Sequence, residues 1–311
     1  MARVSVIIPT HSRPHMLRRA VESARAAGAD VEVVVVDDAS TDETAEVCRA
    51  LEGITYIRLE HNQGVAGARN VGVLASSSDY IAFLDDDDLR LSGSLDRQVA
   101  ALDADRAAGF VCGSMLMSDQ DGRLTGEVTV LGHSGGDAFW ELLELAFPVM
   151  PISVVIRKEC FTRVGLFDSA LPGLDDWDIF VRIAELYPIA IVDEPVGVYT
   201  HPTPSSGQGS SAQARHLSRA ADHHLKLLRL PRVAAAPTDL RRKLRARTLI
   251  RIADTLFFNA ARRLREGSYR VAAANALAAL RLRPSRALRP SGYRRLASML
   301  LVSGPEPPRA H

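Results

Sequence analysis

The stretch Tyr80-Ile81-Ala82-Phe83-Leu84-Asp85-Asp86-Asp87-Asp88 joins an apolar run to four consecutive carboxylates. The apolar run predicts a strand buried on both faces, as in a parallel sheet. Four like charges at its end repel one another unless a cation or a set of hydrogen-bond donors neutralises them. Carboxylate oxygens suit Mg²⁺ or Mn²⁺, which keep coordination positions for substrate phosphates. The stretch therefore predicts phosphate chemistry at a strand end.

Apolar runs alternate with helix-like segments on both sides of this stretch. Val33–Val36 is an uninterrupted run between polar loops, and Ser40 and Glu43 have the spacing of a capping box that would begin a helix at Ser40. The pattern predicts an α/β fold with a mixed, mainly parallel sheet and helices on both faces. The expected strands are 4–8, 31–36, 54–59 and 80–84, and the expected helices are 14–27, 40 onward, 64–75 and 94–104.

The alternation loosens after Gly109. Strands are expected at 110–117, 152–156 and 189–192, helices at 137–146 and 177–186, and loops up to about Gly136. A stretch rich in Ser, Gly and Pro, residues 202–213, precedes further helical patterns, including 239–265 and 269–283. The predicted organisation is a domain 1–204 that divides into 1–110 and 111–204, a linker 205–213, a basic α-helical region 214–302 and a disordered tail 303–311.

The charges divide unevenly along the chain. Residues 1–212 hold 16 of the 38 Lys and Arg but 32 of the 37 Asp and Glu. The basic remainder lacks interleaved aromatic residues and any nucleic-acid-binding motif, and the acidic body repels phosphate backbones, so no nucleic-acid partner is expected. The basic helices are expected instead to contact an anionic membrane or a second copy of the chain.

Composition indicates a globular protein of a reducing compartment. The 311 residues are 47% hydrophobic and 24% charged, which suffices for a full core. Cys48, Cys112 and Cys160 are odd in number and scattered, unlike a disulfide framework. Neither a signal-peptide pattern nor a run of ~18 apolar residues is found. A cytoplasmic protein is expected, with peripheral contact at the inner face of the membrane as an option.

Polar clusters follow each of the first four expected strands. Pro9–Arg13 follows the first, Asp37-Asp38 the second, His61-Asn62 the third and Asp85–Asp88 the fourth. Ligands of an open parallel sheet bind outside the carboxyl ends of its strands, so these clusters are expected to share one rim. One Asp-Asp pair alone is usually a turn, but four successive polar strand ends favour a binding site.

These segments resemble the family-2 inverting glycosyltransferases of GT-A fold, bacterial type. The resemblance rests on Val4–Thr10, Val36–Asp42, Asn62–Asn70 and Phe83–Asp88, in family order and spacing, with Asp175-Asp176-Trp177 completing the set. It implies that residues 1–110 bind the nucleotide and residues 111–204 bind the acceptor. The implied reaction moves a sugar from a nucleoside-diphosphate sugar to a hydroxyl of a glycan, lipid-linked or small-molecule acceptor, in cell-envelope or polysaccharide biosynthesis.

The resemblance also implies roles for single residues. Asp176 is the implied catalytic base, with Asp175 and Trp177 on the acceptor side. Asp87, Asp85 and His201 are the implied ligands of Mn²⁺ or Mg²⁺. The implied donor-binding residues are Pro9, Thr10, His11, Arg13, Asp38, Arg69, Asp85 and Asp86.

Two alternatives stay open at this point. A sugar-phosphate nucleotidyltransferase shares the general sheet and acidic metal site, but it needs a Gly-rich loop after the first strand, and Pro9–Arg13 contains no glycine. A catalytically silent nucleotide-sugar or carbohydrate-binding protein is the other, and intact Asp87 and Asp176 argue against it.

Overall fold

The structure is a computed structural model that describes residues 2–119, 121–171, 175–200, 226–265 and 267–282. The chain divides into two compact units, Met1–Thr203 and Pro204–His311. The predicted linker 205–213, the tail 303–311 and the outer ends of the helical region 214–302 lie outside the described residues. The predicted domain boundaries stay a prediction.

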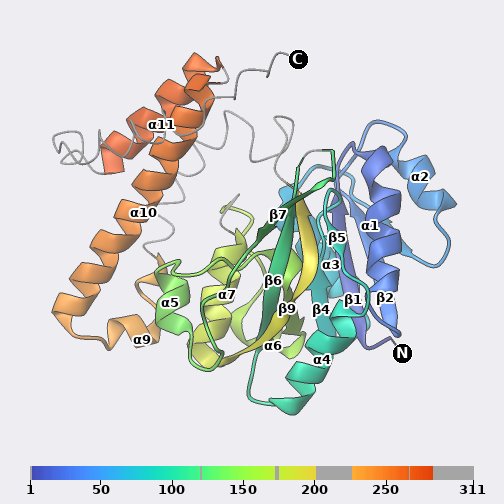
Figure 1. Cartoon of the computed structure of the whole chain (residues 1–311), viewed down its shortest axis with the longest axis horizontal. Helices are drawn as coiled ribbons and strands as arrows, with labels where there is room; N and C mark the ends of the chain where they lie inside the picture. The colour runs from blue at the N-terminus through green and yellow to red at the C-terminus, as the bar shows by residue number, and fades with distance from the viewer. Residues whose placement is uncertain (1, 120, 172–174, 201–225, 266, 283–311) are drawn as a thin grey trace, which may run out of the picture. The chain divides into compact units, whose positions relative to one another are not determined.

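One sheet forms the centre of the first unit (Figure 1), with the strand order β3-β2-β1-β4-β8-β6-β9-β5 and with β7 beside β6. The neighbouring strands β3 (Thr55–Arg58), β2 (Val31–Asp37), β1 (Val4–Thr10) and β4 (Tyr80–Phe83) are parallel, as are β6 (Phe110–Ser118) and β9 (Ile189–Thr200). The strands β8 (Val154–Arg157), β5 (Leu89–Arg90) and β7 (Leu124–Val128) are antiparallel to their partners. This mixed sheet confirms the predicted fold class.

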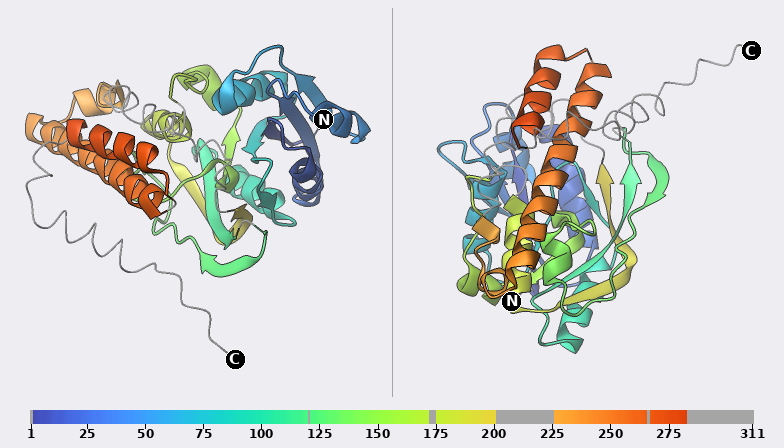
Figure 2. Two further views of the ribbon diagram at one scale, coloured as in Figure 1. Left: turned by 90° about the horizontal axis from the view of Figure 1, so that it is seen from above. Right: turned by 90° about the vertical axis from the view of Figure 1, so that its left-hand side faces the viewer.

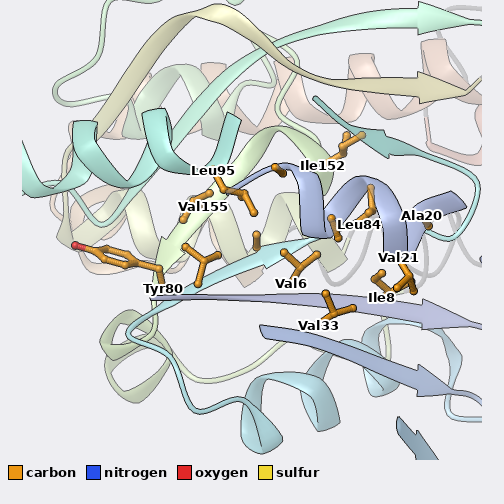
Figure 3. Packing of buried hydrophobic residues seen from close by; sticks show 14 of the residues in the cluster. Val6, Ile8, Ala20, Val21, Val33, Tyr80, Leu84, Leu95, Ile152 and Val155 are labelled. Atoms are coloured by element: carbon orange, nitrogen blue, oxygen red, sulfur yellow. The ribbon is translucent and has the colours of Figure 1, made fainter. Parts of the chain in front are cut away.

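The helices of the first unit cover both faces of the sheet. Those helices are α1 (Pro14–Ala26), α2 (Thr44–Ala50), α3 (Gly64–Ala75), α4 (Ser94–Ala104), α5 (Phe139–Leu143), α6 (Glu159–Val164) and α7 (Asp175–Leu186), with a 3₁₀ turn at Pro151–Ser153. On one face, Val6 and Ile8 of β1 pack with Val21 of α1 and Leu95 of α4 in one buried cluster (Figure 3). Every residue of β1 is buried, as expected for a strand covered on both sides.

On the opposite face, α3 lies directly against β1. A Cβ atom at Gly72 would stand 2.3 Å from Cγ2 of Ile7, a distance that no side chain tolerates, so only glycine permits this approach. Further along the same face, Phe180 of α7 packs on Phe110 of β6, with ring centroids 5.6 Å apart. The close seat of α3 brings its inward side chains to the end of β4.

Several sequence-based boundaries differ from the structure. The capping box at Ser40 was wrong: α2 begins at Thr44, while the Ser40 N–H donates to Asp37 (2.8 Å) and its Oγ accepts from the N–H of Ser12 (2.9 Å). The preceding Ala39 has φ = +61°, so the chain turns there and cannot continue a helix. The loops expected up to Gly136 contain β7, and β9 extends eight residues beyond its expected end at Val192, to Thr200.

The described part of the second unit is helical. It contains α9 (Pro231–Ala234), α10 (Thr238–Arg265) and α11 (Tyr269–Leu282), and the last two lie side by side (Figure 2). Leu256 and Ala260 of α10 and Ala279 of α11 are buried, and Gly267 turns the chain between the two helices with φ = +72°. Within the described ranges, no helix is both long and apolar enough to cross a lipid bilayer.

Candidate active site

The loop after β1 is tied to the acidic run after β4. Thr10 and Asp37 are partners in the parallel register of β1 and β2, so the carboxyl ends of the strands meet at one rim as predicted. The Thr10 hydroxyl donates to Asp86 (2.7 Å), and one Arg13 nitrogen donates to Asp86 (3.0 Å) and Asp87 (2.9 Å). Asp86 is only 5% exposed. These donors neutralise some of the charge that the sequence places at this strand end.

The other three aspartates of the run form a cluster of oxygen ligands. One carboxylate oxygen each of Asp85, Asp87 and Asp88 lies within 4.8 Å of the others. Burial, and then the charge of Asp85, raise the pKa values of Asp87 and Asp88 above their usual range. Three converging carboxylates of this kind fit a hard divalent cation such as Mg²⁺ or Mn²⁺.

Two of the predicted metal ligands, Asp85 and Asp87, belong to this cluster. Asp88, the third member of the cluster, was not among the predicted ligands because an Asp-x-Asp pattern selects alternate residues, although the length of the run was a signal for a third. The N–H of Thr200 donates to Asp88 (2.8 Å), and its hydroxyl donates to the carbonyl oxygen of Asp87 (2.7 Å). These two bonds attach the end of β9 to the cluster. His201 lies outside the described residues and stays a prediction.

A buried arginine, Arg90, anchors the chain just after the cluster. It donates to Gln98 (2.7 Å) and to the carbonyl oxygens of Val154 (3.0 Å) and Phe83 (3.3 Å). Burial lowers its pKa to about 9, against the opposing charge of Asp88. Arg90 thus joins the ends of β4 and β8 to α4, a role without a sequence signal because Val154 is remote from it in the chain.

The Asp38 segment is joined to the loop before α3. The carboxylate of Asp38 accepts from the N–H of Gln63 (2.6 Å), and its carbonyl oxygen accepts from the Asn62 amide (3.2 Å). The Nδ1 atom of His11 also lies 2.8 Å from that carbonyl oxygen. Pro9, within β1, is buried. The structure thus brings the residues predicted to surround the nucleotide base together, and their contact with a donor stays a prediction.

Arg69 of α3 connects the acidic cluster to the start of α7. It is 4% exposed, and its two terminal nitrogens donate to Asp85 (2.7 Å) and to Asp175 (3.2 Å). Burial opposes its charge, but these carboxylates hold the pKa of Arg69 above its ordinary value. The predicted metal ligand Asp85 and the predicted acceptor residue Asp175 therefore share one cation, although 90 positions separate them in the sequence.

Asp176, in the first turn of α7, has the environment of a proton acceptor. It is only partly exposed, and its carboxylate accepts from the N–H of Trp177 (2.7 Å). Burial, and then the charge of Asp175, raise the pKa of Asp176 to about 6, while Arg69 opposes this rise. A carboxylate with a pKa near 6 is matched to taking a proton close to neutral pH.

Trp177 faces the interior. It is buried, and its indole N–H donates to the carbonyl oxygen of Leu142 in α5. It thereby fixes α7 against α5, and its predicted place on the acceptor side stays a prediction.

Comparison with known proteins relates this chain to glycosyltransferases. Residues 5–147 match the model of glycosyl transferase family 2. The GalNAc(5)-diNAcBac-PP-undecaprenol beta-1,3-glucosyltransferase of Campylobacter jejuni is 33% identical over 138 residues, which cover 42% of this chain and 44% of that protein. The chain spans 32%, 62% and 26% of the length of three uncharacterized glycosyltransferases from Rickettsia felis, Haemophilus influenzae and Rickettsia bellii.

Solved structures of two proteins share the fold. S. aureus TarS, residues 1–349, superposes with a TM-score of 0.63 and 20% identity, covering 96% of this chain and 86% of that one. The mannosyltransferase PcManGT from Pyrobaculum calidifontis, in complex with GDP-Man and Mn²⁺, gives a TM-score of 0.59 and 20% identity, covering 96% and 85%. TarS has also been solved with UDP-GlcNAc, at a TM-score of 0.59 and 16% identity, covering 94% and 92%. The chain is therefore similar to glycosyl transferase family 2 over residues 5–147, and its fold is the GT-A architecture of these solved structures.

Proposed function

We propose that this protein is a metal-dependent, inverting glycosyltransferase that moves a sugar from a nucleoside-diphosphate sugar to an acceptor hydroxyl. The observation that carries the proposal is the ion-pair chain Asp85–Arg69–Asp175, which joins the acidic cluster after β4 to the first turn of α7, where Asp176 lies. The relatives' glycosyltransferase names and the nucleotide sugars bound by the structural neighbours support it.

The donor lies along the rim in this proposal. Asp38 reads an N–H edge of the base, and a pocket of Pro9, Thr10, His11 and Arg13 lies below it. Asp85 and Asp87, with Asp88 and His201 as further ligands, hold Mn²⁺ or Mg²⁺, whereas Asp85 and Asp86 border the donor. The cation supplies charge compensation for the diphosphate as it leaves.

Asp176 performs the proton transfer. Its carboxylate accepts the proton of the acceptor hydroxyl while that oxygen forms its bond to the anomeric carbon. The bond from the anomeric carbon to the diphosphate oxygen breaks on the opposite side, so the configuration inverts. Asp175 and Trp177 border the acceptor.

A donor screen tests this function against its alternatives. The protein is incubated with Mn²⁺ and either UDP-GlcNAc or GDP-mannose, plus candidate hydroxyl acceptors, and release of the nucleoside diphosphate is measured. A transferase releases UDP or GDP together with a glycosylated product of inverted configuration. Pyrophosphate release from a nucleoside triphosphate and a sugar 1-phosphate would show a nucleotidyltransferase instead, and saturable binding without turnover would show a silent binding protein.

The acceptor is proposed to be lipid-linked, which places the enzyme at the inner face of the membrane in envelope polysaccharide synthesis. The Campylobacter relative's name contains an undecaprenol diphosphate. Residues 213–311 carry 22 basic and 5 acidic residues, an imbalance that anionic headgroups attract. The helices α10 and α11 of this basic region are also the proposed surface for a homodimer.

This membrane contact predicts salt-sensitive binding. The protein is expected to sediment with phosphatidylglycerol-containing vesicles at low ionic strength and to be released at about 0.5 M salt, because exposed charges are screened beyond ~5 Å there. Vesicles of neutral phosphatidylcholine serve as the control. Failure to bind the anionic vesicles at low salt removes the membrane proposal.

A further inference from the structure

Two adjacent residues of α3, Arg69 and Asn70, reach the chain that leads into α7. The Asn70 amide donates to the carbonyl oxygen of Phe167 (2.9 Å) and accepts from the N–H of the same residue (2.9 Å). Both polar atoms of one side chain are thus engaged by one backbone unit, which fixes its position and its orientation. Phe167 lies between α6 and α7, close before the proposed base.

The ring of Phe167 in turn supports Arg69. The guanidinium carbon of Arg69 lies 5.9 Å from the centroid of Phe167 and 6.0 Å from that of Phe83, the last residue of β4. The two rings contact each other edge to face, with centroids 5.1 Å apart. These contacts are within the range of cation–π attraction and restrict the plane of the guanidinium. Arg69 is therefore held in the orientation in which it meets Asp85 and Asp175.

The helix α7 is also bonded to this segment. Arg182 of α7 donates to the carbonyl oxygens of Val164 and Leu166 and to the carboxylate of Asp178. The segment 164–167 is consequently attached to α7 by Arg182 and to α3 by Asn70. Since α3 is seated on β1 at Gly72, the sheet serves as the reference for the start of α7.

We propose that Arg69 and Asn70, which we name the α3 clamp, are positioning residues that hold the carboxylate of Asp176 in place relative to the cluster after β4. This deepens the proposed function and rests on it, because it takes Asp176 as the base. For Arg69 this is an alternative to the donor-binding role that the resemblance implies, and it is argued from the bonds of its two terminal nitrogens to Asp85 and Asp175. Misplacing a reacting group by about 1 Å costs on the order of 100-fold in rate.

Steady-state kinetics distinguish a positioning role of Arg69 and Asn70 from direct contact with the donor. Arg69→Lys keeps the charge but cannot span two carboxylates, and Asn70→Ala removes the grip on Phe167. Both are expected to lower kcat, by about 100-fold and about 10-fold, with the donor KM and the Kd for UDP with Mn²⁺ within about threefold of the wild type. Arg106→Gln, an exposed residue before β6, is the matched control. A rise in KM and Kd with kcat retained would overturn the clamp in favour of a donor contact.

Hydrogen exchange gives a readout that does not depend on turnover. In Arg69→Lys and Asn70→Ala, amides of residues 164–171 and 175–180 are expected to exchange at least about tenfold faster than in the wild type and in Arg106→Gln, while amides of β1 and β2 keep their protection. Unchanged exchange at residues 164–171 and 175–180 in both variants overturns the clamp even if the protein proves active. If the wild type transfers no sugar but the two variants show this faster exchange, the proposed function is contradicted and the clamp remains as an anchor of α7.

Discussion

Asp176→Asn is expected to lower the rate of sugar transfer by about three orders of magnitude and to leave donor binding within about threefold of the wild type. Asparagine keeps the size of the side chain and its acceptor for the Trp177 N–H, but it cannot take a proton. Loss of a general base typically costs 10²–10⁴-fold, so an effect of this size is decisive. The measurements are kcat from nucleoside diphosphate release and the Kd of UDP with Mn²⁺ by calorimetry.

The pH dependence of the same step gives an independent check. Burial and the charge of Asp175 raise the pKa of Asp176 to about 6. A base works as the carboxylate, which predominates above this pKa, so kcat is expected to fall about tenfold per pH unit as the pH drops below 6. This acid limb should be absent in Asp176→Asn. An unchanged limb, or full turnover, in that variant would show that another group takes the proton.

Asp87→Asn is expected to weaken metal-dependent binding of UDP by on the order of 100-fold, because it removes one charged oxygen from the cluster with Asp85 and Asp88. It also loses the charge that Arg13 pairs with. Titration of Mn²⁺ into the protein with UDP present measures the effect. Asp79→Asn is the matched control, since Asp79 is exposed and precedes β4 whereas the cluster follows it.

A substitution of the neighbouring Asp88 distinguishes two alternative sets of metal ligands. Asp88→Asn should weaken Mn²⁺ binding about as strongly as Asp87→Asn if the three clustered oxygens act together. If Asp88→Asn binds Mn²⁺ like the wild type, the Asp-x-Asp pair expected from the sequence is sufficient. Wild-type affinity in both variants would mean that the cation, if bound, lies elsewhere.

The elements that the sequence predicted well are those with local causes. β1, β2 and β4 are continuous apolar runs because both of their faces are buried, and α3 and α4 have the expected bounds because their patterns are complete within one helix. β7 was not predicted, because every residue of it is exposed and it therefore carries no alternation of apolar and polar side chains. The helix start predicted at Ser40 was wrong because the Ser40 hydroxyl binds the N–H of Ser12, a residue distant in the sequence, instead of capping a helix.

The candidate site shows the same division. The acidic run, Asp38 and the Asp175-Asp176 pair follow or precede predicted elements, so their position at the rim could be inferred from strand ends alone. The hydrogen-bond and ion-pair partner of each side chain could not be inferred in this way. Nothing in the spacing of Arg69, Asp85 and Asp175 indicates an ion-pair chain, and nothing at Asn70 indicates a bond to Phe167, because these contacts arise only when α3 is seated on the sheet.

The end of β9 sets where this domain can be cut from its remaining sequence. Thr200 is the last described residue of the first unit, and both its amide and its hydroxyl are bonded to the aspartates that follow β4. A fragment ending at residue 199 would leave the buried Asp88 without its backbone donor, at a cost of about 1–3 kcal/mol for an unpaired buried acceptor. A chimera that exchanges this domain with that of a relative should therefore have its junction downstream of Thr200, so that the bonds from Thr200 to Asp87 and Asp88 are retained.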